Sequence, residues 1–359
     1  MLEVIVCARC DAVLSAPVSR VALPAHAGFS FGHELLPVLM ESGTYAVDPE
    51  PSGPPWRRWD EIGPEEAAAR GVYAPVHSLS YGPSGTIVIA PGDSRGTAFV
   101  PGRAGGYCCG VSGADGPNLA CEHCGQEVAT LDDDCSMWQA VWFLEHAVRR
   151  RPSGTARRAA DGNPPSAERP GIPPVDPDGY WDLRWEAAAG AALAHLLAAS
   201  GGSPVTLPDG LLTDMFGRAA DALLPPPAPG TPAKRAALAG PGLPAPGPAV
   251  DIALIPRHPR TGEPCPPPGR AGTPPATVPL PAEIWTYLAF TGDRRLVQAP
   301  GTLPDEALRD DPPPPRPWRL FRPESKVFLA TLARLPAVRQ PWLRAIHDRV
   351  RERPYASPF

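Results

Sequence analysis

Proline is the residue that most limits what this chain can fold into. It supplies 53 of the 359 residues, roughly three times its average share of about 5%. Because proline lacks a backbone donor and disrupts helix interiors and central strands, regular elements must lie between the proline runs. Hydrophobic residues still make up 43% of the chain, and there are nine tryptophans. We therefore expect compact domains joined by irregular, proline-rich segments.

Cysteine usage and hydropathy indicate a cytoplasmic protein. No stretch approaches the ~20 apolar residues that a membrane span requires, and the first residues lack the basic start of a signal peptide. Eight cysteines that include two C-x-x-C pairs are then more typical of metal ligands than of disulfides. The bias toward Ala, Pro, Gly and Arg, with very few lysines, is typical of GC-rich bacterial genomes such as those of actinobacteria.

Short strand-like runs dominate the first 150 residues. β-Branched and apolar residues gather in four of them: Leu2–Val6, Thr86–Ala90, Thr97–Val100 and Gln126–Leu131. The Pro/Gly-containing stretch 91–96 between the second and third runs predicts a hairpin. A short helix is expected at Pro64–Arg70, which begins with proline and is followed by glycine, and a helical turn at Glu34–Met40.

A second helix is expected after Asp132–Asp134. Ser136 and Gln139 match a capping box. An apolar stripe follows at helical spacing: Trp138, Val141, Trp142 and Val148. This pattern predicts a helix over residues 136–151. The three aspartates would then interact with the positive end of its dipole, although three carboxylates could also bind Mg²⁺ or Ca²⁺.

The C-terminal half is predicted to be mainly helical. Five helical segments are bounded by proline or glycine: Asp182–Ala199, Pro208–Leu224, Pro281–Phe290, Pro323–Leu335 and Pro341–Arg353. Low-complexity stretches of Pro, Ala and Gly separate them, interrupted by one strand-like run at Val250–Ile255.

Two C-x-x-C pairs point to a metal. Zinc favours four tetrahedral sulfur or nitrogen ligands, and a C-x-x-C turn directs two thiolates at one ion. The residue after such a turn often needs a positive φ, which glycine tolerates best and aspartate accepts. Asp11 follows Cys7 and Cys10, and Gly125 follows Cys121 and Cys124. The four cysteines are therefore candidate ligands of one Zn²⁺.

Strand-like residues beside both pairs complete a resemblance to a zinc ribbon, in which two β-knuckles face each other across one metal. The resemblance covers Leu2–Leu14 and about residues 120–130, and implies a structural zinc closed to substrate. It predicts an α+β protein with a zinc-ribbon-like α+β domain at 1–150, a linker at 151–178 and a proline-rich helical region at 179–359. The chain departs from the family because 110 residues separate Cys10 from Cys121.

A more local ligand set is therefore an alternative. Cys109 precedes Cys121 by 12 residues, an ordinary separation between knuckles. Cys109, Cys121 and Cys124 could bind metal together with His123 or Cys135. Vicinal Cys108 could instead supply the ligand while its neighbour packs inward. Thiol–disulfide chemistry is disfavoured, since a redox C-x-x-C pair begins a helix and neither pair here does.

No sequence motif identifies a reaction. The chain lacks a phosphate-binding loop, a dinucleotide fingerprint, G-x-S-x-G and H-E-x-x-H. Histidines occur without matching partners, at positions such as His33, His77, His195, His258 and His347. We therefore favour a non-catalytic protein, while an enzyme whose site is assembled from scattered residues stays open.

Charge offers a further hypothesis about partners. The net charge is −5, yet residues 316–353 contain ten basic and three acidic side chains. Four arginines there could contact nucleic acid: Arg339, Arg344, Arg349 and Arg351. The simpler interpretation is that they solvate two amphipathic helices, and the knuckle region itself is acidic. The sequence thus favours a cytosolic binding or scaffold protein with protein partners, and a nucleic-acid-binding accessory protein is the alternative.

Overall fold

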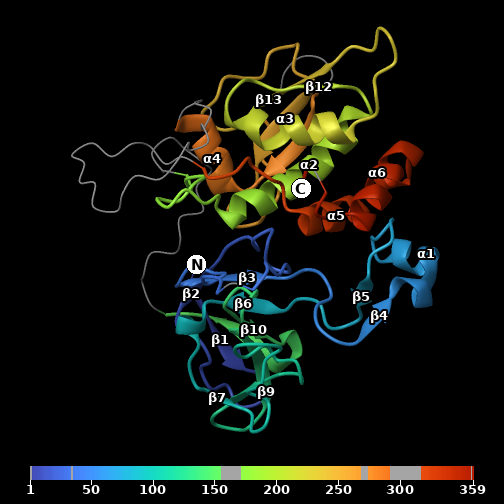
Figure 1. Ribbon diagram of the computed structural model, residues 1–359. Coiled ribbons are helices and arrows are strands. Elements are labelled where there is room, and N and C mark those ends of the chain that lie inside the picture. The colour runs from blue at the N-terminus through green and yellow to red at the C-terminus, as the bar shows by residue number, and fades with distance from the viewer. Residues whose placement is uncertain (1, 34, 155–170, 268–273, 292–316, 357) are drawn as a thin grey trace, which may run out of the picture. The chain divides into compact units, whose positions relative to one another are not determined.

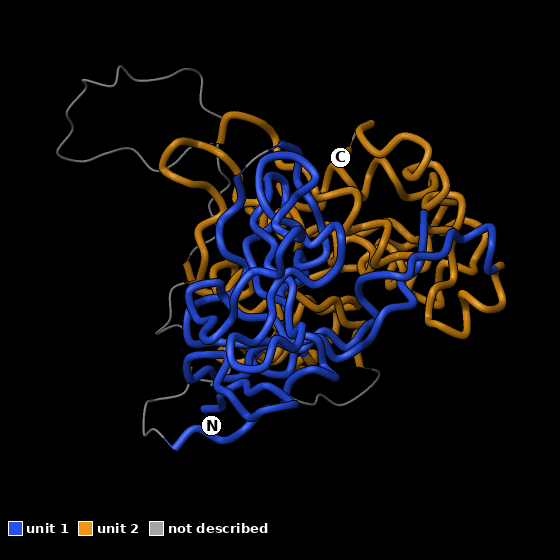
Figure 2. The backbone as a smooth tube through the Cα atoms, turned by 90° about the horizontal axis from the view of Figure 1, so that it is seen from below, with its two compact units in different colours: residues 1–62, 77–163, 259–262 blue, residues 63–76, 164–258, 263–359 orange. Residues whose placement is uncertain are grey.

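The chain folds into two compact units, each described here by itself. A computed structural model describes residues 2–33, 35–154, 171–267, 274–291, 317–356 and 358–359. Unit 1 comprises 1–62, 77–163 and 259–262, and unit 2 comprises 63–76, 164–258 and 263–359 (Figure 2). The undescribed ranges include most of the predicted 151–178 linker and parts of two proline-rich stretches.

Unit 1 is built on one nine-stranded sheet (Figure 1). Its strands are β1 (Leu2–Cys7), β2 (Val18–Arg20), β3 (Thr44–Val47), β6 (Ile87–Ile89), β7 (Thr97–Phe99), β8 (Leu119–Cys121), β9 (Glu127–Asp132), β10 (Ala140–Phe143) and β11 (Val148–Pro152). Their order is β11-β1-β2-β3-β6-β10-β9-β8-β7. The β2–β3 pair is parallel and the others are antiparallel. The predicted knuckles thus belong to a sheet much larger than a ribbon.

Unit 1 also contains smaller elements that are not part of this sheet. Strands β4 (Trp56–Arg58) and β5 (Ser78–Ser80) form a two-stranded ribbon, and two short 3-10 helices are η1 (Pro91–Asp93) and η2 (Glu145–Ala147). The core is apolar and formed by side chains from across the sheet, among them Ile5, Val18, Ile89, Val128 and Phe143.

Three predictions for this half are wrong. Residues 136–151 form β10 and β11 instead of a helix, and Ser136 has a φ of 67°. Spacing alone misleads here, because β-branched and aromatic side chains also suit a strand buried between two neighbours, and β10 pairs with β6 and β9. The two runs flanking 91–96 are strands, but β6 and β7 do not pair with each other. Residues 35–40 are not helical, and Glu34 lies outside the described residues.

Unit 2 combines a four-stranded parallel sheet with helices (Figure 1). The strands, in sheet order, are β12 (Val205–Thr206), β13 (Lys234–Leu238), β14 (Ile252–Pro256) and β15 (Ala276–Leu280). The helices are α2 (Leu183–Ser200), α3 (Leu211–Leu223), α4 (Ala282–Phe290), α5 (Ser325–Arg334) and α6 (Pro341–Glu352), with η3 (Pro336–Arg339) between the last two. The five predicted helices are confirmed, but the region is not simply helical.

Helix α2 is the centre of unit 2. It packs against β14, β15 and α5, and it is capped by Asp182 at its start and by Gly201, with a φ of 62°, at its end. Gly190 allows the close approach to α5, since a Cβ there would lie 2.4 Å from the carbonyl oxygen of Glu324.

The predicted Pro64–Arg70 helix is confirmed as the later part of α1 (Trp59–Ala69), which is interrupted at Gly63.

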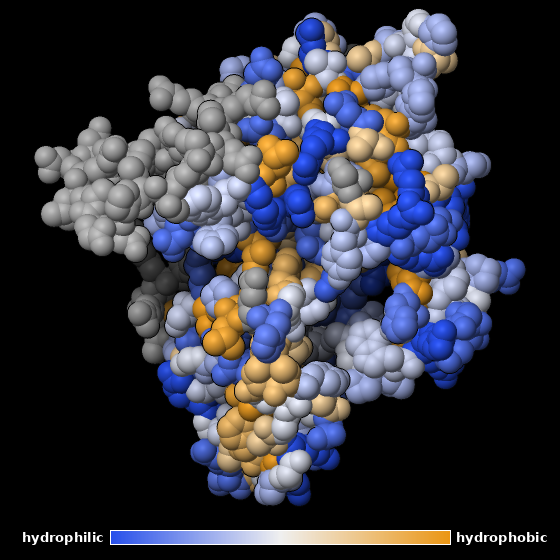
Figure 3. All heavy atoms as spheres, in the orientation of Figure 1, coloured by the Kyte–Doolittle hydropathy of each residue, from blue (hydrophilic) through white to orange (hydrophobic). Residues whose placement is uncertain are grey.

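The two edges of the sheet in unit 1 differ in chemistry. Strand β11 carries Arg149, Arg150 and Arg151, and charged side chains on an edge discourage further strand pairing. Strand β7, at the opposite edge, has the neutral sequence Thr-Ala-Phe, and the Phe99 side chain is 49% exposed. Figure 3 shows hydrophobic residues gathered at the end of unit 1 where β7 and β9 lie.

Candidate metal centre

The first knuckle begins where β1 ends. The backbone N–H of Cys7 donates to the carbonyl of Ala12 at 2.8 Å, and the N–H of Asp11 donates to the carbonyl of Cys7 at 3.0 Å. Asp11 has a φ of 59°, as the sequence predicted. These bonds curl residues 7–11 into a tight turn that places the thiols of Cys7 and Cys10 on one side.

The second knuckle repeats this geometry between β8 and β9. Cys121 N–H donates to the carbonyl of Gln126 at 2.8 Å, and Gly125 N–H donates to the carbonyl of Cys121 at 2.8 Å. Gly125 has a φ of 72°, again as predicted. The two C-x-x-C segments therefore share one hydrogen-bond pattern, although their flanking sequences differ.

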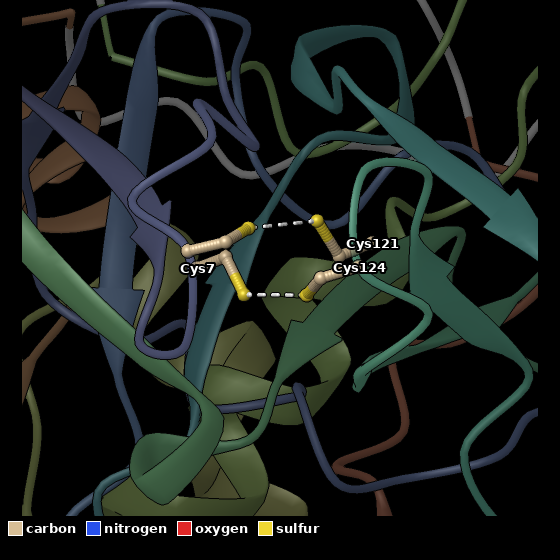
Figure 4. A group of neighbouring side chains, drawn as sticks. Cys7, Cys121 and Cys124 are labelled. Carbon is tan, nitrogen blue, oxygen red and sulfur yellow. Dashed lines mark hydrogen bonds between the residues drawn. The ribbon is translucent and has the colours of Figure 1, made fainter.

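The two knuckles bring their four sulfur atoms together. The sulfurs of Cys7, Cys10, Cys121 and Cys124 lie within 4.8 Å of one another and could hold a metal ion. Across the site, Cys7 Sγ is 3.7 Å from Cys124 Sγ, and Cys10 Sγ is 3.7 Å from Cys121 Sγ (Figure 4). Thiolates about 2.3 Å from a tetrahedral zinc lie about 3.8 Å apart. These two distances across the site thus match the spacing around a tetrahedral ion.

The surroundings favour the thiolate form of Cys124 but not that of Cys10. The amide of Gln126 lowers the pKa of Cys124 to about 7, against the opposing effect of burial. The amide of Ala12 likewise lowers the pKa of Cys10, but burial and the three neighbouring thiols outweigh it and raise that pKa to about 12. Four thiolates this close repel one another, and a divalent cation would neutralise that repulsion.

The sheet explains how cysteines so distant in sequence meet. Strand β1 pairs with β11, and the N–H of Ala8 donates to the carbonyl of Ala147 at 2.9 Å. The second knuckle connects β8 to β9, which pairs with β10. Most of the 110 residues between the knuckles belong to unit 1 and supply five strands of the same sheet, whereas residues 63–76 belong to unit 2.

The alternative ligand set, Cys109 with Cys121 and Cys124, is not brought together in the structure. Among the described residues, Cys109 and Cys135 belong to a different group of potential ligands, with His33 and Cys108. His123 is exposed within the second knuckle, as expected for a side chain directed away from the sulfurs. Cys265 belongs to unit 2 and to neither group.

Among the three aspartates, Asp134 has a role that the sequence did not predict. No helix follows them; Asp133 instead forms an isolated bridge with Val111. The buried carboxylate of Asp134 accepts hydrogen bonds, at 2.6–3.0 Å, from five backbone amides: those of Tyr107, Cys108, Cys109, Gly110 and Cys135. Burial acts to raise the pKa of Asp134, but these amides outweigh it and lower that pKa to about 2.

Three of the four arginines proposed for nucleic-acid contact have partners inside unit 2. Arg339 lies over the ring of Tyr73, with 4.5 Å between the guanidinium carbon and the ring centroid. Arg344 pairs with Asp348 at 3.0 Å, one helical turn away, and Arg349 donates to the carbonyl of Leu223. Helix α6 buries Leu343, Ile346 and Val350 on its other face. This arrangement fits the simpler interpretation of an amphipathic helix with a solvated arginine face.

Unit 2 also contains a small pocket of about 230 Å³. It is lined by Glu186, Arg319, Arg322, Pro323, Glu324, Ser325, Pro354, Tyr355 and Phe359, and none of these is a histidine. The histidines with lowered pKa values lie elsewhere: burial and the charge of Arg257 lower the pKa of His195 to about 4, and buried His347 lies against Asp348 with 3.2 Å between Nδ1 and Oδ1. The pocket therefore brings together acids and arginines without a histidine base.

No helix in the described ranges is both long and apolar enough to cross a membrane. Comparison with protein-family models, curated proteins and solved structures finds no match to this chain. The geometry of the sites is therefore the basis for inferring a function.

Proposed function

We propose that this is a non-catalytic cytosolic binding or scaffold protein whose N-terminal unit is organised by one structural zinc ion. Cys7, Cys10, Cys121 and Cys124 would hold the ion. The observation that carries this proposal is the pair of matching knuckles, whose sulfur atoms lie at tetrahedral spacing across the site.

The donor set supports a structural ion over a catalytic one. Four protein thiolates fill a tetrahedral zinc, so no position is left for water or substrate. Cys7 and Cys121 are also buried within the apolar core of unit 1. An ion there would crosslink the end of β1 to the turn between β8 and β9.

The binding role rests on the open edge of that sheet. Strand β7 has no charged side chain and exposes Phe99, whereas β11 at the other edge has three arginines. An extended peptide can add a strand to an exposed edge, gaining main-chain hydrogen bonds and a pocket or ring contact for its side chains. We therefore place the protein-binding surface at β7.

Elemental analysis of the purified full chain tests the zinc site. We expect Cys7→Ser and Cys121→Ser each to lose one zinc ion per chain relative to the wild type, because each removes one thiolate of the same site. Cys265→Ser, a cysteine of unit 2, is the matched control and should keep the wild-type zinc content. If zinc is unchanged in Cys7→Ser but lost in Cys121→Ser, a local ligand set binds the metal and the shared site is refuted.

Site-specific photocrosslinking in the producing cell tests the binding surface. A photoreactive residue at position 99 should give covalent adducts with a partner protein, and the same residue at position 151 on the arginine edge should not. Absence of adducts at position 99, or equal adducts at both positions, would refute binding at β7.

The nucleic-acid alternative has less support from the geometry. Phosphate contact requires basic side chains free to face the ligand, and Arg339, Arg344 and Arg349 each have a partner within unit 2.

A further inference from the structure

A second group of metal-ligating side chains lies in unit 1. Nδ1 of His33 and the sulfurs of Cys108, Cys109 and Cys135 all lie within 4.8 Å of one another. His33 Nδ1 is 3.0 Å from Cys135 Sγ and 4.0 Å from Cys108 Sγ, and the vicinal sulfurs are 3.4 Å apart. Around a tetrahedral zinc, a nitrogen and a sulfur lie about 3.5 Å apart and two sulfurs about 3.8 Å apart. The group is slightly irregular but has the right size for one ion.

The backbone around these cysteines is held in place by Asp134. Its single carboxylate binds the amides of all three cysteines, together with those of Tyr107 and Gly110. Successive amides of 107–110 therefore converge on one point, and this bends the chain so that two adjacent cysteine side chains can turn to the same side. An extended strand would direct them to opposite faces.

Glycines on either side make this bend sterically allowed. A Cβ at Gly110 would lie 1.9 Å from the carbonyl oxygen of Asp133. A Cβ at Gly106 would lie 2.2 Å from the carbonyl oxygen of Gly110 and 2.7 Å from the carboxylate of Asp134. Only glycine fits at these two positions, so the sequence Gly-Tyr-Cys-Cys-Gly at 106–110 is matched to the conformation.

His33 reaches the cysteines through a separate set of contacts. The N–H of Phe31 donates to the carbonyl of Ser136 at 3.0 Å, and the N–H of Leu39 donates to the carbonyl of Gln139 at 2.9 Å. The ring of Phe31 also packs edge-on against Trp138, with centroids 5.9 Å apart. These contacts fix the segment that carries His33 alongside the segment that begins at Cys135.

The donor chemistry selects the ion. Three thiolates and one imidazole are soft to borderline ligands that suit Zn²⁺ and exclude Mg²⁺ or Ca²⁺, which need oxygen. His33, Cys108 and Cys109 are exposed, unlike the buried cysteines of the first site. A metal bound here is open to solvent and to competing ligands.

We propose that His33, Cys108, Cys109 and Cys135 form a second zinc site, of the Cys₃His type, that exchanges its metal more readily than the Cys₄ site. Asp134 acts as a positioning residue that orients the three cysteines. This site is independent of the four cysteines in the proposed function, and the two proposals can fail separately.

Zinc stoichiometry of the reduced full-length chain is the first test. After reconstitution with zinc and removal of unbound metal, we expect two ions per wild-type chain. The double variant His33→Asn/Cys109→Ser, which alters two exposed side chains, should retain one ion, and Cys7→Ser/Cys10→Ser should retain the other. Cys265→Ser should retain two.

The remaining ion should be identifiable by its ligands. In Cys7→Ser/Cys10→Ser, zinc X-ray absorption should show three sulfurs at about 2.3 Å and one nitrogen at about 2.0–2.1 Å. If this variant fails to fold, His33→Asn/Cys109→Ser supplies the complementary result, a bound zinc with four sulfurs. A chromogenic chelator should remove one ion from the wild type faster than the other, and this fast phase should be missing from His33→Asn/Cys109→Ser.

Other outcomes overturn one proposal or the other. One zinc per wild-type chain, lost in Cys7→Ser/Cys10→Ser, would refute the second site and leave the first. One zinc lost only in His33→Asn/Cys109→Ser would support the second site and refute the proposed structural zinc. A disulfide between Cys108 and Cys109 that persists under reducing conditions, detected by thiol mass mapping, would also refute the second site.

Discussion

Unit 1 contains seven of the eight cysteines, whereas unit 2 contains only Cys265. The sheet of unit 1 is formed by short strands, each of three to six residues. The described residues of unit 1 include no helix other than two 3-10 turns and the first residues of α1. Unit 2 instead surrounds a parallel sheet with helices and fully buries large side chains such as Trp185, Trp285 and Phe328. With the proposed zinc bound, unit 1 would add a metal crosslink to its apolar core, whereas unit 2 relies on helix-on-sheet packing.

Of the changes considered, removing zinc should have the largest effect, and it should affect unit 1 and not unit 2. A structural zinc site contributes on the order of 10 kcal/mol to folding, so a strong chelator should destabilise the strands of unit 1 that lead into the two knuckles. Unit 2 should keep its protection, because both candidate metal groups found among the described residues belong to unit 1. Hydrogen exchange followed by mass spectrometry should show protection lost in β1, β8 and β9 and kept in α2 and α5.

The same measurement has an internal control. Chelator treatment of Cys265→Ser should give the wild-type exchange pattern, because this cysteine belongs to neither thiol group. Equal loss of protection in α2 and in β9 would contradict the difference drawn between the units.

A packing defect in unit 2 should have the next largest effect. Phe328 in α5 is fully buried, and truncation of a buried phenylalanine typically costs about 3–5 kcal/mol. Phe328→Ala should therefore lower the denaturant midpoint of unit 2, by the same amount with and without zinc. Phe99→Ala, on an exposed phenylalanine, is the matched control and should change stability by less than about 0.5 kcal/mol. A zinc-dependent effect of Phe328→Ala would contradict the proposed difference.

Unit 2 should also respond to pH through Glu186. Burial raises the pKa of this carboxyl to about 7, although the adjacent Arg319 opposes the shift. A raised carboxyl pKa means that the folded state holds the proton more tightly than the unfolded state. The contribution of Glu186 to stability should therefore be complete below a pH of about 4.5 and should fall by up to about 3 kcal/mol as the pH rises to 7.

Glu186→Gln removes the titrating group and should flatten this decline. The measurement is the denaturant midpoint of unit 2 between pH 4.5 and 8. Glu283→Gln, on an exposed glutamate of α4, should keep the wild-type decline. An unchanged slope in Glu186→Gln would show that another group is responsible.

The arginines of α6 should give the smallest change. Exposed i,i+4 ion pairs such as Arg344–Asp348 contribute about 0.3–0.5 kcal/mol, so the triple variant Arg344→Ala/Arg349→Ala/Arg351→Ala should lose less than about 1 kcal/mol. Fluorescence anisotropy with generic DNA and RNA should show no salt-dependent binding by the wild type. Salt-dependent binding that is lost in the triple variant would instead favour the nucleic-acid alternative.

Local signals made part of this structure predictable from the sequence. The positive φ of Asp11 and of Gly125 follows from the short-range geometry of a C-x-x-C turn. The helices of unit 2 were also predictable, since prolines, glycines and the Asp182 cap act within one turn of the helix they delimit. Each of these predictions depended on residues only a few positions apart.

The failures depended on contacts between distant residues. Ala140–Phe143 is a strand because β6 and β9 lie on either side of it, which the spacing of Trp138 and Val141 does not reveal. Strand β13, Lys-Arg-Ala-Ala-Leu, has no strand-like composition and is stabilised by its parallel neighbours. His33 lies 75 residues before Cys108, so no motif search would join them; only the fold does.

The separation of the two knuckles also sets an order of events during synthesis. At roughly 5–20 residues per second, the 110 residues between Cys10 and Cys121 take roughly 5–20 seconds to add. Through that interval Cys7 and Cys10 provide only half a ligand set, and β1 lacks its partner β11. Strand β1 is therefore made well before its partner β11, and Cys7 and Cys10 lack their two partner cysteines until the second knuckle is made.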